Sequence, residues 1–266
     1  MVRTCHQNGG RNMAENCSRR QPCDPRLKNG HVDVWCVSLD MEPSVLSGFH
    51  PMLSEDERRK ASRFRFKNMK ARYVAARGVL RSIIAAYLDA RPGDLAFQYG
   101  RYGKPALAGA FSDAEITFNM SHSHGMALYA VSFGNAVGVD IEKIRSGMSF
   151  HRIAKRFLSP RESEILQRLP PDQVKNAFFT CWTRKEAYIK ARGEGLSSLL
   201  SRFSVSLAPG DPPALIDHQP DPGEISRWSL TDLQIGAGYA AALAVEGHGL
   251  TVTKKKWDIA ATPRDM

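Results

Sequence analysis

The order of the predicted secondary-structure elements repeats once along the chain, and this repeat limits the fold more than any other feature. A strand-like run at 32–39 precedes two helical patterns, and three short strand-like runs follow them. After the Gly134-Asn135 turn the same order returns, although the two stretches share no repeat of sequence. The repeat predicts an α+β fold built as a pseudo-twofold pair of similar α+β halves. The expected strands lie at 32–39, 95–99, 116–121, 126–132, 136–142, 202–207, 227–235 and 238–246, and the expected helices begin near 54, 69, 150, 159 and 172.

Helix-start signals support this division. Ser54 followed by Glu57 forms a capping box, in which each residue satisfies a backbone N–H of the other. Ser159 followed by Glu162 forms a second one, with Pro160 at the first helical position. The chain is therefore divided into a disordered basic tail, an N-terminal half, a C-terminal half that carries the candidate metal site, and a polar C-terminal tail, at 1–30, 31–134, 135–248 and 249–266.

The long helix of the second half has boundary signals of its own. Asp172 follows two prolines and is the expected N-cap, and Gly193 is the expected stop after Arg192. The helix between them carries several bulky apolar residues, which indicates that much of its surface is buried.

Composition places the chain among soluble proteins of a reducing compartment. It has 266 residues, with 42% apolar and 24% charged, and no apolar run long enough to span a membrane. The first thirty residues lack the apolar segment of a secretory signal. Five scattered cysteines without a CxxC pair favour the cytoplasm and argue against a disulfide framework or a structural zinc site. The net charge of +10 indicates an acidic or phosphorylated partner without choosing between them.

Two carboxylates on one predicted strand raise the first chemical question. Asp140 and Glu142 are two positions apart in AVGVDIEKIR, so the strand places both on one face. Like charges so close need a compensating cation. That cation is either a metal or the neighbouring Lys143 and Arg145 at a solvated strand end, and the stretch alone does not choose.

A third carboxylate lies on the long second-half helix. Trp182, Glu186 and Lys190 are spaced four residues apart and share one face. An exposed Glu–Lys pair is the ordinary interpretation, but the apolar residues around Glu186 indicate a buried helix in which the carboxylate needs a partner. Together with Asp140 and Glu142 it would supply three oxygen ligands, which suit Mg²⁺ bound partly through a phosphate.

Two glycine- or histidine-containing turns add candidate anion contacts. GRYGKP places Arg101 and Lys104 on a tight turn, where a lysine and backbone N–H groups can meet a phosphate, although a hairpin turn with solvated charges is the ordinary interpretation. NMSHSH places Ser121 and His122 directly after a strand, and no third His or Cys nearby completes a metal site. A phosphate-contacting Ser and His fits the basic surroundings better than a hydrolase site.

The motifs GRYGKP, FNMSHS, GVDIEKIR, FLSPRESEIL and CWTRKEAYIKARGEGLS, in this order, resemble the Sfp-type 4′-phosphopantetheinyl transferases. The resemblance runs from about 53 to 207. It implies the two-half transferase fold and transfer of the phosphopantetheine group of coenzyme A to a serine of an apo acyl or peptidyl carrier protein, with release of adenosine 3′,5′-bisphosphate. The carrier proteins would be those of polyketide, nonribosomal peptide or fatty-acid synthesis.

The resemblance also implies roles for individual residues. Asp140, Glu142 and Glu186 fall on the Mg²⁺ ligands, and Glu186 is the first candidate for general base. Lys190 falls on a catalytic lysine that contacts the coenzyme A phosphates. The implied coenzyme A contacts are Lys60, Arg72, Lys104, Ser121, His122, Lys185 and Lys190.

One position departs from the resemblance. Where some relatives carry a phosphate-binding lysine early in the basic helix, this chain has Glu57, so the contact is either absent or made by Arg58 or Arg59. Two alternatives to the transferase are a basic nucleic-acid-binding module and an inactive relative that only binds carrier proteins. No nucleic-acid-binding motif favours the first, and intact Asp140, Glu142, Glu186 and Lys190 argue against the second. The length, about twice that of the single-half relatives, favours the monomeric two-half type. No nucleic-acid or membrane partner is expected, because neither a nucleic-acid-binding motif nor a membrane-spanning run is present.

Overall fold

The computed structural model describes residues 29–147, 149–195, 200–219 and 221–257. Its strands are β1 (His31–Ser38), β2 (Ala96–Tyr99), β3 (Pro105–Ala108), β4 (Ile116–Ser123), β5 (Met126–Phe133), β6 (Val137–Lys143), β7 (Phe203–Val205), β8 (Leu215–His218), β9 (Trp228–Asp232), β10 (Tyr239–Glu246) and β11 (Thr251–Lys256). Its α-helices are α1 (Pro43–Phe49), α2 (Glu55–Ser62), α3 (Lys67–Leu88), α4 (Phe150–Phe157), α5 (Pro160–Arg168) and α6 (Pro171–Arg192). Short 3-10 helices lie at His50–Met52, Pro92–Asp94, Gly109–Phe111, Leu200–Arg202 and Pro222–Ser226.

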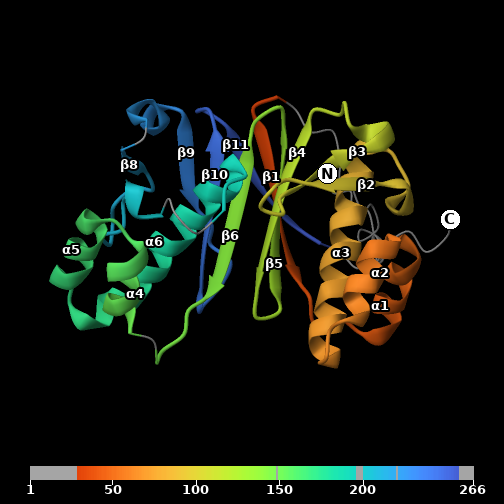
Figure 1. Cartoon of the computed structure of the whole chain (residues 1–266), viewed down its shortest axis with the longest axis horizontal. Coiled ribbons are helices and arrows are strands. Elements are labelled where there is room, and N and C mark those ends of the chain that lie inside the picture. Colours follow the sequence, from red (N-terminus) through yellow and green to blue (C-terminus); the bar gives the residue numbers. More distant parts are fainter. Residues whose placement is uncertain (1–28, 148, 196–199, 220, 258–266) are drawn as a thin grey trace, which may run out of the picture.

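The two halves are arranged alike. The first sheet has the strand order β11-β1-β5-β4, the second has β6-β10-β9, and the pairs β1–β5 and β6–β10 are both antiparallel. The sheets stand at the centre of the molecule, with α1 to α3 outside one and α4 to α6 outside the other (Figure 1). One apolar cluster lies between α3 and the first sheet, another surrounds α6, and a third joins β1 and β5 to β6 and β10. The predicted α+β pair of similar halves is confirmed.

Both predicted capping boxes are present at the helix starts. Glu57 N donates to Ser54 Oγ at 3.3 Å, and Ser54 N donates to Glu57 Oε2 at 2.9 Å. The corresponding distances at Ser159 and Glu162 are 3.2 and 2.8 Å. In each half the box therefore fixes a short helix, α2 or α5, ahead of a helix of 22 residues.

The position of α6 depends on two glycines. Gly193 has φ +69° and caps its C-terminus, as predicted, because glycine adopts the left-handed conformation without strain. Gly138 lets the helix approach β6, since a Cβ at this position would lie 2.1 Å from the Ala187 carbonyl oxygen. The helix residues near Ala187 are thereby held directly over the strand that carries Asp140.

Some predictions about the elements were wrong. The polar tail expected from 249 onward instead contributes β11, which pairs in parallel with β1. The short elements α1, β3 and β8 were not predicted. Asp172 is not the N-cap of α6, because that helix begins at Pro171 and its N-cap residue Pro170 makes no side-chain cap. Residues 1–28 of the basic tail predicted at 1–30, and the end of the chain at 258–266, lie outside the described residues. In the part of the chain that the structure describes, no helix is long and apolar enough to cross a membrane.

Candidate functional site

A row of polar side chains on β4 joins the two halves. Alternate residues of an extended strand point the same way, so Thr117, Asn119, Ser121 and Ser123 all face β6. Thr117 donates to the Asn135 carbonyl, and further along the row each side chain bonds to a partner on β6. These partners are Val139 N, which donates to Asn119 Oδ1 at 3.0 Å, the Asp140 carboxylate, the Glu142 carboxylate and Lys143 N. Hydrogen bonds from side chains therefore connect β4 to β6, which belong to different sheets.

The row holds the two carboxylates of β6. Ser121 Oγ donates to Asp140 Oδ1 at 2.8 Å, and Ser123 Oγ donates to Glu142 Oε2 at 3.0 Å. Lys190 reaches the same place from α6, with its Nζ 2.6 Å from Asp140 Oδ1 and 2.9 Å from Ser121 Oγ. Asp140 and Glu142 thus share one face of the strand, as predicted. The ammonium of Lys190 offsets part of their negative charge.

Glu186 lies one turn before Lys190 and completes the acidic group. Burial raises its pKa to about 7, and the charges of Asp140 and Glu142 act in the same direction. Burial also raises the pKa of Glu142, again together with Asp140. Asp140 Oδ2 and Glu186 Oε1 are buried, and neither has a hydrogen-bond partner among the described residues. Two buried carboxylate oxygens without a donor are costly unless a cation or a proton joins them.

The chemistry of these oxygens fits a hard divalent cation, but the geometry does not yet form a metal site. Within the described ranges, no three His, Cys, Asp or Glu side chains are arranged to hold a metal ion. The predicted three-carboxylate set is therefore not assembled as it stands. In the structure the Lys190 ammonium bonds to Asp140 Oδ1, and Glu142 Oε2 accepts from Ser123.

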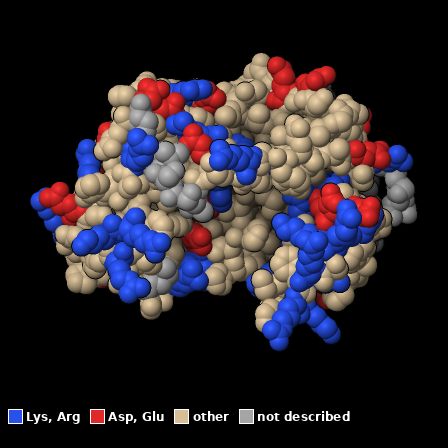
Figure 2. Space-filling view, in the orientation of Figure 1, with Lys and Arg blue, Asp and Glu red and all other residues tan. Residues whose placement is uncertain are grey.

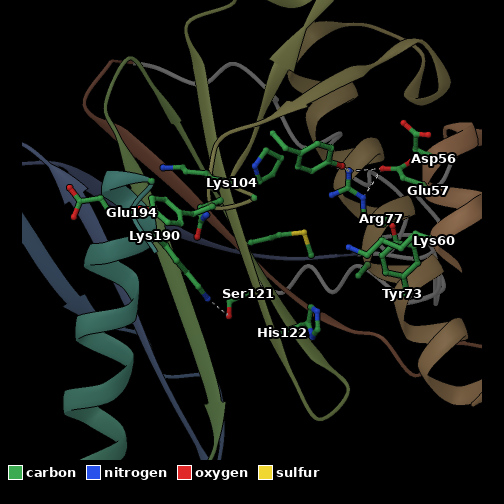
Figure 3. A pocket seen from close by; sticks show the side chains of 18 residues that line it. Asp56, Glu57, Lys60, Tyr73, Arg77, Lys104, Ser121, His122, Lys190 and Glu194 are labelled. Atoms are coloured by element: carbon green, nitrogen blue, oxygen red, sulfur yellow. Dashed lines mark hydrogen bonds and ion pairs between the residues drawn. The ribbon is translucent and has the colours of Figure 1, made fainter. Parts of the chain in front are cut away.

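A cavity of about 690 Å³ opens beside this group and is lined by both halves (Figure 3). Lys190 and Ser121 stand at one side of it, and Glu57, Lys60 and Arg77 stand at the other. Of the predicted coenzyme A contacts, it brings together Lys60, Lys104, Ser121, His122 and Lys190.

His122 lies between the two sides of the cavity. Burial lowers its pKa, and the nearby Lys190 lowers it further. The imidazole is thereby favoured in its neutral form, with one ring nitrogen donating and the other accepting.

Lys104 lies in the wall between the halves rather than on a solvated turn. Its Nζ donates to the Val137 carbonyl at 3.0 Å and to the Ala191 carbonyl at 2.8 Å. Burial lowers its pKa to about 8. The lysine therefore ties the first-half hairpin turn to β6 and to the C-terminal end of α6, where unpaired carbonyl groups attract a cation.

Two predicted contacts do not belong to the cavity. Lys185 is fully buried, and its ammonium bonds to both oxygens of Glu162 at 2.7 Å and to the Phe203 carbonyl. Its neighbour in sequence, Glu186, faces the site, whereas Lys185 points into the core on the other side of the helix. Arg72 pairs with Asp40 at 2.7 Å near the exposed surface, and it is not among the residues that line the cavity.

Sequence reasoning missed several residues that line the cavity. Tyr73, Arg77, Tyr99 and Asn119 all do so. For Arg77 a signal was available, because it and Arg81 are charged residues four positions apart inside the otherwise apolar stretch YVAARGVLRSII. A buried pair of this kind requires a carboxylate partner, and the structure supplies Glu57.

Comparison with known proteins identifies the family that this fold and site define. Residues 136–244 match the family described as the 4′-phosphopantetheinyl transferase superfamily, and residues 42–133 match the family described as 4′-phosphopantetheinyl transferase, N-terminal. The 4′-phosphopantetheinyl transferase HetI of Nostoc is 39% identical over 229 residues, covering 86% of this chain and 93% of the relative. The transferase Sfp of Bacillus subtilis is 35% identical over 159 residues, covering 60% and 68%.

The chain therefore belongs to the 4′-phosphopantetheinyl transferase superfamily and is an enzyme of that class. The family predicted from the motifs is confirmed.

Solved structures of holo-[acyl-carrier-protein] synthases also match. The enzyme of Thermotoga maritima aligns with a TM-score of 0.34 at 22% identity, covering 42% of this chain and 62% of that chain. The Helicobacter pylori enzyme, solved in complex with coenzyme A, aligns with a TM-score of 0.30 at 24% identity, covering 42% and 99%.

Proposed function

We propose that the enzyme transfers the 4′-phosphopantetheine group of coenzyme A to a serine of an acyl or peptidyl carrier protein, with Mg²⁺ as its metal. The observation that carries this proposal is the pair of buried, unpartnered oxygens on Asp140 and Glu186, set beside Lys190 at one side of a 690 Å³ cavity. A cavity of this size suits a nucleotide-containing donor. Membership of the 4′-phosphopantetheinyl transferase superfamily supports the same donor.

Asp140 and Glu186, with Glu142 beside them, would hold the Mg²⁺ ion. Such an ion takes carboxylate oxygens together with phosphate oxygens and neutralises the charge that develops during phosphoryl transfer. The chain's own cations act on the same charge. Lys190 and Ser121 each present a donor at the Asp140 carboxylate, where the diphosphate of coenzyme A would lie.

The reaction itself needs positioning more than a specialised nucleophile. The carrier serine oxygen forms a bond to the phosphorus that bears the pantetheine arm, and the bond from that phosphorus to the leaving adenosine 3′,5′-bisphosphate breaks. The serine proton must be accepted, and Glu186 is the candidate; since direct coordination to the metal would lower the basicity of its carboxylate, it would accept the proton through a metal-bound water.

The carrier protein would approach over a basic face. Figure 2 shows Lys and Arg gathered over α4 and over the start of α3, on either side of a hollow. The exposed residues concerned are Arg63, Arg65, Lys67, Lys70, Arg152, Lys155 and Arg156. Such a surface steers an acidic partner toward the site. Because Lys60 and Lys190 of one chain line the same cavity, we further propose that a monomer suffices.

The test is to incubate the protein with apo carrier protein, coenzyme A and Mg²⁺, and to weigh the carrier by mass spectrometry. We expect a gain equal to one phosphopantetheine group, lost when EDTA removes the metal. Polyketide, peptidyl and fatty-acid carrier proteins should be tried in parallel. If none of them gains mass while the protein remains folded, the proposal is wrong.

A further inference from the structure

Arg77 is a buried cation that faces the cavity. It lies on α3, is 6% exposed and lines the side of the cavity away from Lys190. Its Nε donates to Glu57 Oε1 at 2.6 Å, and its Nη2 bonds to the same oxygen and to the Tyr99 hydroxyl, which lies 2.9 Å away. The guanidinium is therefore fixed in orientation, while its Nη1 has no acceptor in the part of the chain that the structure describes.

The cations of α2 do not take this position. Arg58 donates to the Leu53 carbonyl at 2.7 Å, and Arg59 pairs with Asp56 and Glu55 on the helix surface. Neither lines the cavity. Lys60 does line it, with its ammonium 5.6 Å from the centre of the Tyr73 ring, but its long side chain is exposed and has many conformations available.

The charge around Arg77 remains positive despite its carboxylate partner. Glu57 is shared with Arg81, whose Nε lies 2.7 Å from Glu57 Oε2, so two guanidinium groups stand against one carboxylate. Arg81 donates its remaining hydrogen bonds to the Pro92 and Leu95 carbonyls and does not reach the cavity. The excess charge is thus presented to the cavity by Arg77.

The chemistry of the donor tells which group would meet it. Coenzyme A has a diphosphate, which contains the reacting phosphorus, and a separate phosphomonoester on the ribose 3′ oxygen. If the diphosphate lies at Asp140 and Lys190, the opposite side of the cavity receives the ribose end of the molecule. A guanidinium whose orientation is already fixed can donate its free Nη1 N–H groups to a phosphate oxygen in a charge-assisted hydrogen bond, with little further loss of conformational entropy.

We propose that Arg77 is a phosphate-binding residue that selects a donor bearing the 3′-phosphomonoester, with Glu57 and Tyr99 as its positioning residues. This proposal rests on the proposed function for the identity of the donor. The Ser54–Glu57 capping box then has a second use, because the same carboxylate that caps α2 also orients the guanidinium.

The experiment compares two ligands and two matched variants. The ligands are adenosine 3′,5′-bisphosphate and adenosine 5′-monophosphate, titrated calorimetrically without carrier protein, so that binding is measured apart from activity. Arg77→Gln and Arg81→Gln each remove one of the two cations of Glu57, but only Arg77 faces the cavity. For the wild type we expect a preference of about tenfold or more for the bisphosphate, which is the size of one or two charged hydrogen bonds.

Arg77→Gln should reduce that preference to about threefold or less, mainly by weakening the binding of adenosine 3′,5′-bisphosphate. Arg81→Gln should lower the melting temperature but keep the preference. If Arg77→Gln does not fold, Tyr99→Phe, which removes one orienting hydrogen bond and no charge, should still lower the preference by about threefold. In transfer assays, the ratio of kcat/KM for coenzyme A over dephospho-coenzyme A should follow the same order.

The proposal is overturned if the wild type binds both ligands equally, or if Arg81→Gln lowers the preference as much as Arg77→Gln does. It is also overturned if the foldable variants, Tyr99→Phe included, keep the wild-type preference. These results are distinct from failure of the proposed function. If the proposed function is wrong, no carrier protein gains mass with either donor, whatever affinities the calorimeter gives for the two nucleotides.

Discussion

The two halves bury a carboxylate at the same place and use it differently. Glu57 and Glu162 each belong to a capping box, and each meets a cation from the following 22-residue helix. Arg81 and Lys185 both stand 14 positions after the first residue of that helix. In the second half the pair is sealed, since Lys185 and Glu162 are fully buried. In the first half a second cation, Arg77, joins the carboxylate and opens onto the cavity.

The first strand of each half carries a buried aspartate, and the two aspartates differ in their surroundings. Asp33 on β1 and Asp140 on β6 are both buried, and each bonds to a side chain of the long helix of its half, Tyr87 or Lys190. Asp33 accepts on Oδ2 from Lys255 of β11 at 2.6 Å and from the Tyr87 hydroxyl. Asp140 has Lys190 and Ser121 on one oxygen and nothing among the described residues on the other. The cation of the first carboxylate comes from β11 and that of the second from α6, and of the two only Asp140 has an oxygen that is buried without a partner among the described residues.

Removing the charge of the second-half carboxylates should give the largest loss of transfer activity. Asp140→Asn and Glu186→Gln are each expected to lower the rate of transfer about 100-fold or more, because each removes a carboxylate oxygen proposed to hold the metal. Asp33→Asn, the matched change in the first half, should leave the rate within about threefold and lower the melting temperature. Mass spectrometry of the carrier protein over time measures the rates. Equal losses for Asp33→Asn and Asp140→Asn would remove the distinction between the two strands.

Lys185→Met tests whether the second-half pair is purely structural. The variant leaves Glu162 buried without its cation, so we expect a loss of about 3–5 kcal/mol in the free energy of unfolding. The double variant with Glu162→Gln should recover part of that loss, because no buried charge then remains. Urea unfolding measures both. At a temperature where the single variant is folded, its KM for coenzyme A should equal that of the wild type. A raised KM would show that Lys185 contributes to coenzyme A binding.

Comparison of these residues shows what the sequence could and could not reveal. Both capping boxes were predictable because Ser and Glu three positions apart at a helix start interact locally. The shared face of Asp140 and Glu142 was predictable from strand periodicity. Lys185 was misplaced because a motif records spacing along the chain, whereas a difference of one residue on a helix turns the side chain by about 100°.

The remaining failures concern contacts between distant segments. Nothing in TVTKKK indicates that it pairs with β1, since it carries three consecutive lysines and only one large apolar residue. The role of Arg77 required knowing that Glu57, 20 residues earlier, is buried beneath the same helix. Composition and local pattern do not carry that information, because it depends on how α2 packs on α3.

Acid should destabilise the first-half cluster through Glu57. Burial by itself would raise the pKa of this carboxyl group, but Arg77 and Arg81 outweigh it, so the pKa lies below its usual 4.5. A lowered pKa in the folded state means that the contribution to stability is present above pH 4.5 and disappears as pH falls through the folded pKa. Glu57→Gln should therefore cost about 3 kcal/mol at pH 7 and progressively less in acid. Urea unfolding between pH 3 and 7 measures the difference, and a constant difference would contradict the ion-pair explanation.

The smallest expected effects concern the polar row between β4 and β6, which has no counterpart at β9. Both β4 and β9 are edge strands of their sheets, but only β4 carries the series of side chains that bond to the other half. Asn119→Ala should cost about 2 kcal/mol in the free energy of unfolding, because Val139 N–H is left buried without an acceptor. Thr117→Val, which removes one hydroxyl donor near the end of the row, should cost about 1 kcal/mol in the free energy of unfolding.

Asn119→Ala should also accelerate hydrogen exchange at the Val139 amide more than at the neighbouring amides of β6 and β10, since those amides keep their backbone partners. If exchange accelerates equally throughout the second sheet, the row stabilises the sheet as a whole rather than the junction between the halves.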